Sequence, residues 1–308
     1  MIRTALVTLA ALTALPTLAW NNVGHMAVAA IAYDGLSPQA RLRVKELLKL
    51  NPDHARWIAA AGTNDPDKVA FMRSAYWPDD IKFRSSYEDD SQWSAKAADV
   101  SGYADKARHK YWHYKDIPFT IDGTGLPKPS KAPNAQTQIA KMRGLLSSAA
   151  TEDVKSYSLA WLAHLVGDVH QPLHASARFS NVHPKGDGGG NAVTVCTSGC
   201  VSLHSFWDDA VGATWGNEDP IPKALKVQQR LASSFQVDAQ QAAKSAESIW
   251  ISESYGLARK YAYAQPVGTG TGSFTLDQTY RSNAGSTAEK RIALAGARLA
   301  NLLNDHLK

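Results

Sequence analysis

The stretch of residues 164–174, HLVGDVHQPLH, constrains the fold more than any other part of this sequence. Proline cannot donate a backbone hydrogen bond and disfavours helix at the residue before it, so a helix through His164 and Asp168 must end near Gln171. Residues four apart share one helix face. The pattern therefore predicts that His164 and Asp168 point the same way, while His174, beyond Pro172, lies on the following loop.

A second His-x3-Asp pair, His204 and Asp208, follows later in the chain. An imidazole nitrogen and a carboxylate oxygen on one helix face are ligands that zinc accepts. One such pair is weak evidence, but two pairs and the additional His174 are hard to explain as chance. His170 points about 240° away from His164 around the helix. We therefore predict a zinc site without His170, which we interpret as a structural histidine.

Two further histidines and an aspartate fit a shared metal site. His25 lies near the expected start of the mature chain, and His113 lies in the sequence YWHYKD. Asp79 offers a carboxylate, with its neighbour Asp80 as a rival. The remaining histidines have polar or terminal surroundings and are expected to be solvent-exposed; they are His54, His109, His183 and His306.

Residues 1–19 have the features of a secretory signal peptide: the basic residue Arg3, an apolar run over 5–15 and small residues before a cleavage site after Ala19. The mature chain would then begin at Trp20 and be secreted or periplasmic. A retained membrane anchor is the alternative. No later stretch reaches about 18 unbroken apolar residues, so no membrane span is expected.

The net charge and the cysteines add weaker constraints. Removing Arg3 lowers the formal charge from +5 to +4, which is compatible with a polyanionic substrate without demanding one. Cys196 and Cys200 stand between two β-prone runs, residues 192–195 and 201–203. In an exported chain they are expected to form a disulfide across a hairpin turn, with a Cys-x3-Cys metal site as the alternative.

Helical periodicity dominates the mature chain, and no long linker interrupts it. We expect a mainly α, single-domain fold over residues 20–308, with one short β-hairpin around the cysteines. Loops or lids are expected at 116–133, 180–190 and 267–273. Apolar residues recur at three- and four-residue spacing in segments 24–33, 38–50, 134–149, 151–170, 222–234, 239–263 and 286–307.

Several motifs now stand in one order: a tryptophan at the mature N-terminus with a histidine five residues on, Trp-x-Asp, His-Tyr-x-Asp, His-x3-Asp-x-His-Gln-Pro-Leu-His, Gly-Gly-Asn and a final His-x3-Asp. In this the sequence resembles the secreted trinuclear-zinc nucleases, the family of the fungal single-strand-specific enzymes nuclease S-one and nuclease P-one. The resemblance runs from Trp20 to Asp208. The related zinc-dependent phospholipases C share the architecture and the N-terminal tryptophan.

The resemblance implies a multi-helix fold of the phospholipase C and P-one nuclease type, and three Zn²⁺ ions. The use of Trp20 makes physical sense only after signal cleavage, because an amine in a peptide bond is not a basic ligand. The resemblance implies that one ion is held by Asp79, His113, His164 and Asp168. Asp168 would also bridge to a second ion, which takes His25 and the amino nitrogen and carbonyl oxygen of Trp20. The third ion would be held by His174, His204 and Asp208.

The same resemblance implies the chemistry. Three Zn²⁺ and three aspartates would leave a charge of about +3, which suits a phosphodiester. Zinc-activated hydroxide would attack, so no protein general base is needed, and Asp79, Lys82 and Asp168 are the catalytic candidates. Lys82 matches a basic position near the scissile phosphate, or is a solvated surface lysine. Hydrolysis of RNA and single-stranded DNA would leave 5′-phosphates, and terminal 3′-phosphates could also be removed.

Three residues match the family's nucleobase pocket. Tyr114 would stack on a base, which tolerates any base identity, and Asp116 would hydrogen-bond it. Asn191 follows three glycines, residues 188–190, which could equally form a tight turn. The sequence departs from the family in a longer segment at 176–190 and in its Cys196–Cys200 pair, which puts the substrate-facing rim in doubt.

Two rival functions remain open at this point. A phospholipase C of related fold would need an apolar groove for acyl chains beside the zinc ions. A zinc-stabilised binding protein without activity would need closed coordination shells, and the number of His and Asp candidates exceeds what a structural zinc site requires. We expect single-stranded nucleic acids and nucleotides as substrates, and no obligate protein partner.

Overall fold

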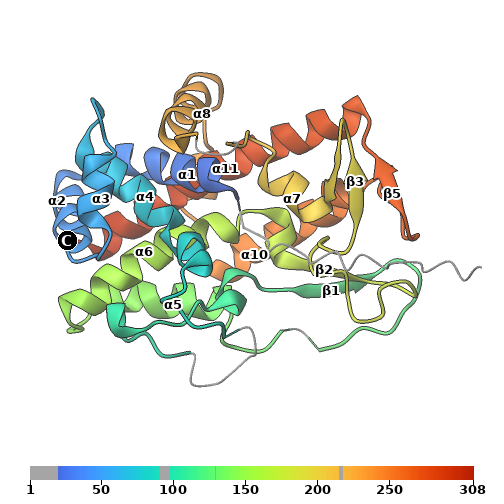
Figure 1. Ribbon diagram of the computed structural model, residues 1–308, viewed down its shortest axis with the longest axis horizontal. Coiled ribbons are helices and arrows are strands. Elements are labelled where there is room, and N and C mark those ends of the chain that lie inside the picture. Colours follow the sequence, from blue (N-terminus) through green and yellow to red (C-terminus); the bar gives the residue numbers. More distant parts are fainter. Residues whose placement is uncertain (1–19, 91–97, 129, 215–217) are drawn as a thin grey trace, which may run out of the picture.

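The computed structural model describes residues 20–90, 98–128, 130–214 and 218–308. Within these ranges the chain forms eleven α-helices and five short strands (Figure 1). The predicted mainly α fold with a short hairpin is confirmed. The signal peptide predicted at residues 1–19 lies outside the described ranges. None of the described helices combines the length and the apolar character that crossing a bilayer requires.

The central helix is α6 (Glu152–Asp168). Thr151 caps its first turn by accepting a hydrogen bond from the backbone of Val154, and the acidic Glu152 favours the positive end of the helix dipole. Every residue from Ser156 to Asp168 is buried, as expected of an interior helix. The helix ends before Pro172, as predicted, and so holds His164 and Asp168 deep inside the molecule.

Helices surround α6 on several sides. On two of them lie α4 (Pro66–Asp80) and α5 (Ala135–Leu146), and α4 also packs against α1 (Asn22–Asp34). Gly296 of α11 (Gln278–His306) lets α1 pack closely against that helix, because a Cβ at this position would lie 2.6 Å from Ile31 of α1. The helices that complete this part of the molecule are α2 (Pro38–Leu48), α3 (His54–Ala59), α8 (Pro220–Ser234) and α11.

The strands lie together at the other end of the molecule (Figure 1). β1 (Ile117–Thr120) pairs in parallel with β2 (Ser176–Phe179). The prediction of a loop throughout 116–133 is therefore wrong at its start, because β1 gains its backbone hydrogen bonds from a strand that is distant in the sequence. β3 (Thr194–Cys196) pairs antiparallel with β4 (Cys200–Ser202) and parallel with β5 (Ser273–Thr275). The predicted disulfide is present at the end of the hairpin, where Cys196 pairs with Cys200.

One predicted helix, residues 239–263, is wrong. It is divided into α9 (Ala239–Ala242), α10 (Glu247–Leu257) and a π-helical turn, η6 (Ala258–Ala262). The indole of Trp250 donates to the carbonyl of Lys244, and Arg298 donates to that of Gln241. Side chains therefore take up backbone carbonyls that a continuous helix would use. In addition, α3 and α4 were not predicted, α7 (Leu203–Asp208) was implied only by the His-x3-Asp spacing, and α11 begins before residue 286.

A buried ion network supports the end of α6. The ring of His170 donates through Nδ1 to the carbonyl of Val166, and its Nε2 accepts from Arg298 at 2.9 Å. Arg298 also forms hydrogen bonds of 2.7 and 2.9 Å with Glu253, which in turn binds Arg291. His170 therefore ties α6 to α10 and α11, and its predicted structural role is confirmed.

Replacing Arg298 by methionine is expected to lower the free energy of unfolding by about 3 kcal/mol, because Glu253 and His170 would lose a buried partner. Urea denaturation followed by circular dichroism measures this. The control is Arg230→Met, which removes an exposed ion pair with Glu289 and should cost no more than about 1 kcal/mol. Equal effects of the two substitutions would show that the network does not hold α6.

Candidate metal centre and substrate pocket

Five metal-ligand candidates from four separate elements meet at the end of α6. Their ligand atoms form two overlapping groups, each within 4.8 Å: His25, Asp79 and His164, and then His113, His164 and Asp168. His25 comes from α1, Asp79 from α4 and His113 from η4 (Lys110–His113), a short 3-10 helix. All five are at most 2 % exposed. The structure thus brings together the residues that the sequence assigned to the paired ions.

A third group of ligands lies close by. His174 of η5 (Pro172–Ala175) and both His204 and Asp208 of α7 have ligand atoms within 4.8 Å of one another. Gln171 donates to one oxygen of Asp208 at 2.7 Å and so orients the carboxylate. Sequence reasoning passed over Gln171, although it lies inside the motif that drew attention to this region.

Backbone carbonyls set the tautomers of three of these histidines. Nδ1 of His164 lies 2.8 Å from the carbonyl oxygen of Ala75. Nδ1 of His174 lies 2.7 Å from the carbonyl oxygen of His113, and Nδ1 of His204 lies 2.8 Å from that of Gly189. A carbonyl only accepts, so each Nδ1 carries the proton and each neutral ring leaves Nε2 as a free lone pair. This is the arrangement typical of metal-binding histidines.

Two of these lone pairs face each other: Nε2 of His174 and Nε2 of His204 are 3.0 Å apart. They repel unless a positive charge lies between them. Burial lowers the pKa of both rings, that of His204 to about 4, which disfavours a proton in this place. The donor set therefore fits a metal cation.

The carboxylates lead to the same conclusion. Asp79, Asp168 and Asp208 are all at most 3 % exposed, and buried charges require partners. Burial raises the pKa of Asp168 and that of Asp208. The pKa of Asp79 is lowered despite burial, because the ammonium of Lys82 lies 2.7 Å from its Oδ1. One lysine cannot balance three carboxylates, whereas divalent cations can.

Unsatisfied polar atoms mark the same place. Both ring nitrogens of His25 and one oxygen each of Asp79 and Asp168 are buried without a hydrogen-bond partner. Nε2 of His25 is 3.3 Å from Asp168 and 3.9 Å from Asp79. Trp20 is fully buried, and its ring lies on the same side of Gly167 as the ring of His25.

The structure decides between Asp79 and Asp80. Asp80 points away from the metal groups and pairs with Arg84 and with Arg56. Pro78 lies within α4, a helix that the sequence analysis did not predict. The helix continues past the proline and directs Asp79 inward.

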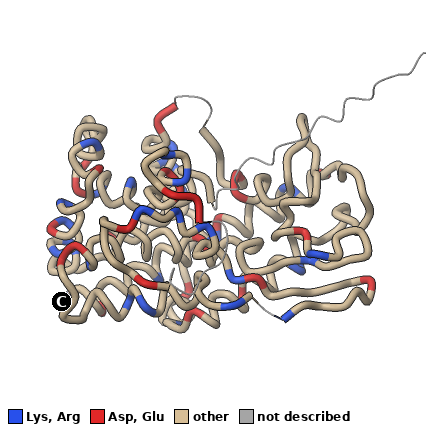
Figure 2. The backbone as a smooth tube through the Cα atoms, turned by 60° about the horizontal axis from the view of Figure 1, so that its bottom comes forward, with Lys and Arg blue, Asp and Glu red and all other residues tan. Residues whose placement is uncertain are grey.

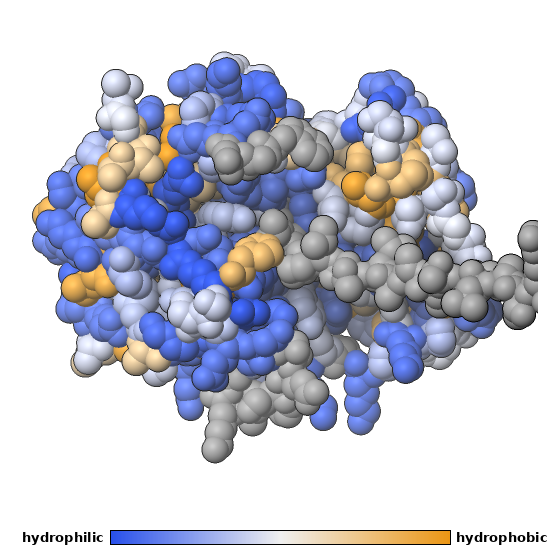
Figure 3. Space-filling model, viewed as in Figure 1, coloured by the Kyte–Doolittle hydropathy of each residue, from blue (hydrophilic) through white to orange (hydrophobic). Residues whose placement is uncertain are grey.

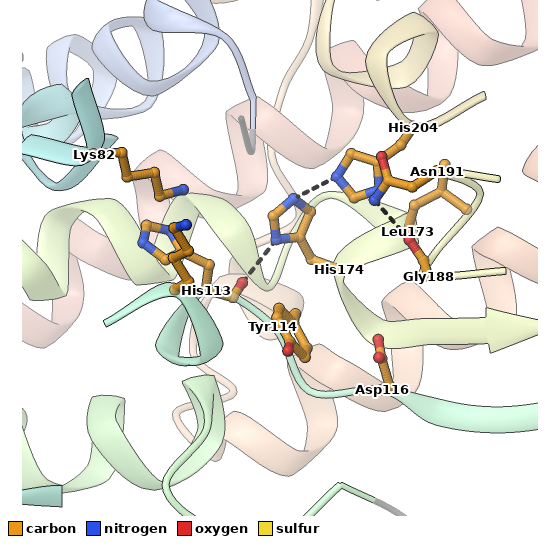
Figure 4. A pocket seen from close by; sticks show the side chains of 10 residues that line it. Lys82, His113, Tyr114, Asp116, Leu173, His174, Gly188, Asn191 and His204 are labelled. Atoms are coloured by element: carbon orange, nitrogen blue, oxygen red, sulfur yellow. Dashed lines mark hydrogen bonds between the residues drawn. The ribbon is translucent and has the colours of Figure 1, made fainter. Parts of the chain in front are cut away.

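A pocket of about 330 Å³ opens beside the metal groups. Figure 4 shows Lys82 and His113 on one side of it, His204 and Asn191 on the other, and Tyr114 and Asp116 below. All four predicted substrate-binding residues therefore share one cavity with metal ligands. Its lining consists of Lys82, Lys110, His113, Tyr114, Asp116, Leu173, His174, Gly188, Asn191 and His204.

The part of the pocket formed by Tyr114 and Asp116 differs in chemistry from the part formed by the metal ligands. The ring of Tyr114 is partly exposed, as a stacking surface must be. Burial and the nearby Asp187 raise the pKa of Asp116 to about 7. Asp187 is held by the hydroxyl of Tyr263 and by the backbone of Arg178. Lys110 also lines the pocket, although sequence analysis did not single it out.

The glycines before Asn191 form a tight turn beside the third metal group. Residues 188–190 all have positive φ, from 60° to 84°, as a tight turn requires. A Cβ on Gly189 would lie 2.5 Å from the carbonyl oxygen of Leu173 and 3.4 Å from Nδ1 of His204. The turn therefore also allows the backbone to approach the third metal group and orient His204.

One expectation about the remaining histidines is wrong. His109 is only 2 % exposed, because carboxylates on two separate segments face its ring. No local sequence pattern indicates this contact, since Asp90 is distant along the chain.

Gly167→Ala tests the paired-metal group. A Cβ there would lie 2.8 Å from Nδ1 of His25, so the ring must move and we expect the content of bound divalent metal to fall by about one ion. Plasma mass spectrometry measures it. Gly144→Ala is the control, because that helical glycine has open space around it and alanine should stabilise the helix by up to about 1 kcal/mol. Unchanged metal content in Gly167→Ala would contradict the assignment of His25.

Comparisons with known proteins agree with this geometry. The chain is similar to three Arabidopsis thaliana proteins: Endonuclease 3, with 27% identity over 93% of this chain and 88% of the relative, Endonuclease 5, with 27% identity over 93% and 90%, and Endonuclease 4, with 26% identity over 93% and 89%. The model of the family described as S1/P1 Nuclease matches residues 20–308. Since this match spans the metal groups, the pocket and the helices around them, the chain belongs to the S1/P1 nuclease family.

Proposed function

We propose that this nuclease is an exported, zinc-dependent endonuclease and 3′-nucleotidase that hydrolyses RNA and single-stranded DNA to 5′-phosphorylated products. One observation carries the proposal: a single pocket is bounded by metal-ligand histidines and by a partly exposed tyrosine beside a half-buried aspartate. A nucleotide would place its phosphate beside the metal-ligand histidines and its base beside the tyrosine and the aspartate.

The donor set suits zinc, which accepts imidazole nitrogen and carboxylate oxygen. His113, His164, Asp79 and Asp168 would hold one ion, His25, Asp168 and the amino-terminal Trp20 a second, and His174, His204 and Asp208 a third. Bound zinc would neutralise phosphate charge and supply hydroxide at neutral pH. Signal cleavage before Trp20 would free the amine, so that export and activation would be one event.

The chain's own residues bind and orient the substrate. Lys82 is 7 % exposed and held against Asp79, yet it lines the pocket. It would therefore present a fixed positive charge to the phosphate. Tyr114 would stack on the base without selecting it, and Asp116 and Asn191 would hydrogen-bond its edge. The carboxylate of Asp168 would position two ions at once.

The pocket gives little support to the phospholipase alternative. Leu173 is the one aliphatic side chain among the ten pocket-lining residues of the described ranges. On the face shown in Figure 3, apolar residues form separate groups on a mostly hydrophilic surface. Basic and acidic residues are interspersed over the helical part (Figure 2), so that attraction of a polyanion would depend on the bound metal ions more than on the outer surface.

Zinc stoichiometry and product analysis test the proposal together. The mature protein beginning at Trp20 should bind about three zinc ions and release 5′-phosphorylated products from single-stranded RNA until a chelator is added. Asp168→Asn should lower kcat about a hundredfold or more, because the substitution weakens the binding of two ions. Loss of a residue that only hydrogen-bonds to a metal ligand already costs up to about a hundredfold. Diacylglycerol release without nucleotide release would favour the phospholipase.

Tyr114→Ala separates substrate binding from metal binding. Loss of stacking should cost about 1 to 3 kcal/mol, which appears as a rise in KM for oligonucleotides of roughly 5- to 150-fold. Zinc content should remain unchanged, since the tyrosine side chain is not a ligand candidate. A loss of zinc would show instead that Tyr114 holds the adjacent His113 in place.

A further inference from the structure

We propose that His109 is a positioning residue for the reaction: a clamp formed by Asp90, His109 and Asp105 fixes residues 110–114, three of which line the pocket. The role in catalysis rests on the proposed function, whereas the clamp itself does not. We call these three side chains the His109 clamp.

Carboxylates face both nitrogens of one buried ring. Nε2 of His109 lies 2.8 Å from an oxygen of Asp105, and Nδ1 lies 3.3 Å from an oxygen of Asp90. The Nε2 contact is a hydrogen bond, whereas Nδ1 lies within ion-pair distance of Asp90 without forming a hydrogen bond. Because a carboxylate faces each nitrogen, the protonated and charged form of the ring is favoured. The ring therefore links two carboxylates from different segments through its charge.

Aromatic rings complete the surroundings. The indole of Trp112 stacks on His109 with centroids 3.6 Å apart and planes 3° from parallel, and Trp161 of α6 meets its edge. An aromatic face stabilises a cation stacked on it. The hydroxyl of Tyr111 donates to Asp90. Among the described residues, the charged groups facing the ring are thus Asp90 and Asp105, and uncharged aromatic side chains pack against it.

The backbone shows that the clamp holds a demanding conformation. His109 has φ 47° and ψ 45°, the left-handed region that non-glycine residues seldom adopt. Such residues persist only where their surroundings determine them. His109 is the N-cap of η4, and its carbonyl accepts from the backbone of Trp112 at 2.8 Å. The clamp therefore sets where this short helix begins.

Three functional side chains follow directly from this starting point. Lys110, His113 and Tyr114 all line the pocket, and His113 also belongs to a metal group. Because η4 has only four residues, it has little helical stability of its own. A shift at His109 would move the lysine, the metal ligand and the stacking ring together.

The main test compares His109→Asn with Asp105→Asn and the double variant. Asparagine tolerates the left-handed backbone but cannot bind both carboxylates. The assay measures kcat on a single-stranded oligonucleotide, at a temperature well below the Tm of each protein variant. His109→Asn should lower kcat at least tenfold, and Asp105→Asn should lower it several-fold. The double variant should be no worse than His109→Asn alone, since both substitutions break one interaction.

The control is His54→Asn, which replaces a half-buried histidine outside the pocket and should leave kcat unchanged. A variant that lowered Tm but kept the wild-type kcat per folded molecule would overturn the positioning role. So would additive losses in the double variant, because they would show that the two side chains act independently.

A titration observes the clamp directly. Burial alone lowers the pKa of His109, but the hydrogen bond to Asp105 and the charges of Asp105 and Asp90 outweigh it and raise the pKa above its ordinary value. The clamp is therefore complete below about pH 6.5 and is lost as pH rises through the raised pKa. The His109 nuclear magnetic resonance signal, identified by its absence in His109→Asn, should titrate above 6.5, and Asp105→Asn should shift it downward.

Titration at or below 6.5 in the wild type would overturn the clamp. The wild-type oligonucleotide assay keeps this result separate from the proposed function. If the zinc-loaded wild type released no nucleotides, the proposed function would fail, while the titration and the zinc affinity of His109→Asn would still report on the clamp. Unchanged zinc affinity together with unchanged kcat would show that His109 does not position His113.

Discussion

The burial of Asp79, Asp168 and Asp208 is the constraint on which the rest of this structure depends. Carboxylates removed from water must be matched by cations, and Lys82 is the only lysine or arginine paired with any of them in the described ranges. The surrounding histidines bring lone pairs rather than charge. A centre of this kind would be stable with divalent ions bound, so folding and metal binding would be coupled.

A second layer of contacts makes this centre specific. Backbone carbonyls from α4, η4 and the glycine turn hold three imidazoles in the tautomer that leaves Nε2 free. Gln171 orients Asp208, and the Arg298 network fixes the end of α6 through His170. Each contact joins elements that are distant in the sequence. Precision at the centre is therefore a property of the whole helical assembly and not of the local motif.

The pocket brings together two recognition chemistries. Lys82 and the metal groups suit a phosphate, while Tyr114 and Asp116 offer a ring face and a polar edge. Both parts meet in η4, which carries His113 into the metal centre and is followed at once by Tyr114. This shared segment is short and has little helical stability, and for this reason the contacts of His109 acquire importance for the geometry of the whole pocket.

The sequence by itself determined the mainly α fold, the break of α6 at Pro172, the hairpin disulfide and the set of candidate ligands, because helical spacing, proline chemistry and cysteine spacing are local properties. Only the tertiary structure decided that Asp79 faces the metal centre and Asp80 does not, that Lys110 lines the pocket, that residues 239–263 form separate helices, and that His109 is buried between Asp90 and Asp105. These outcomes depend on contacts between distant segments, whose free energies outweigh local preference and leave no periodic trace in the chain.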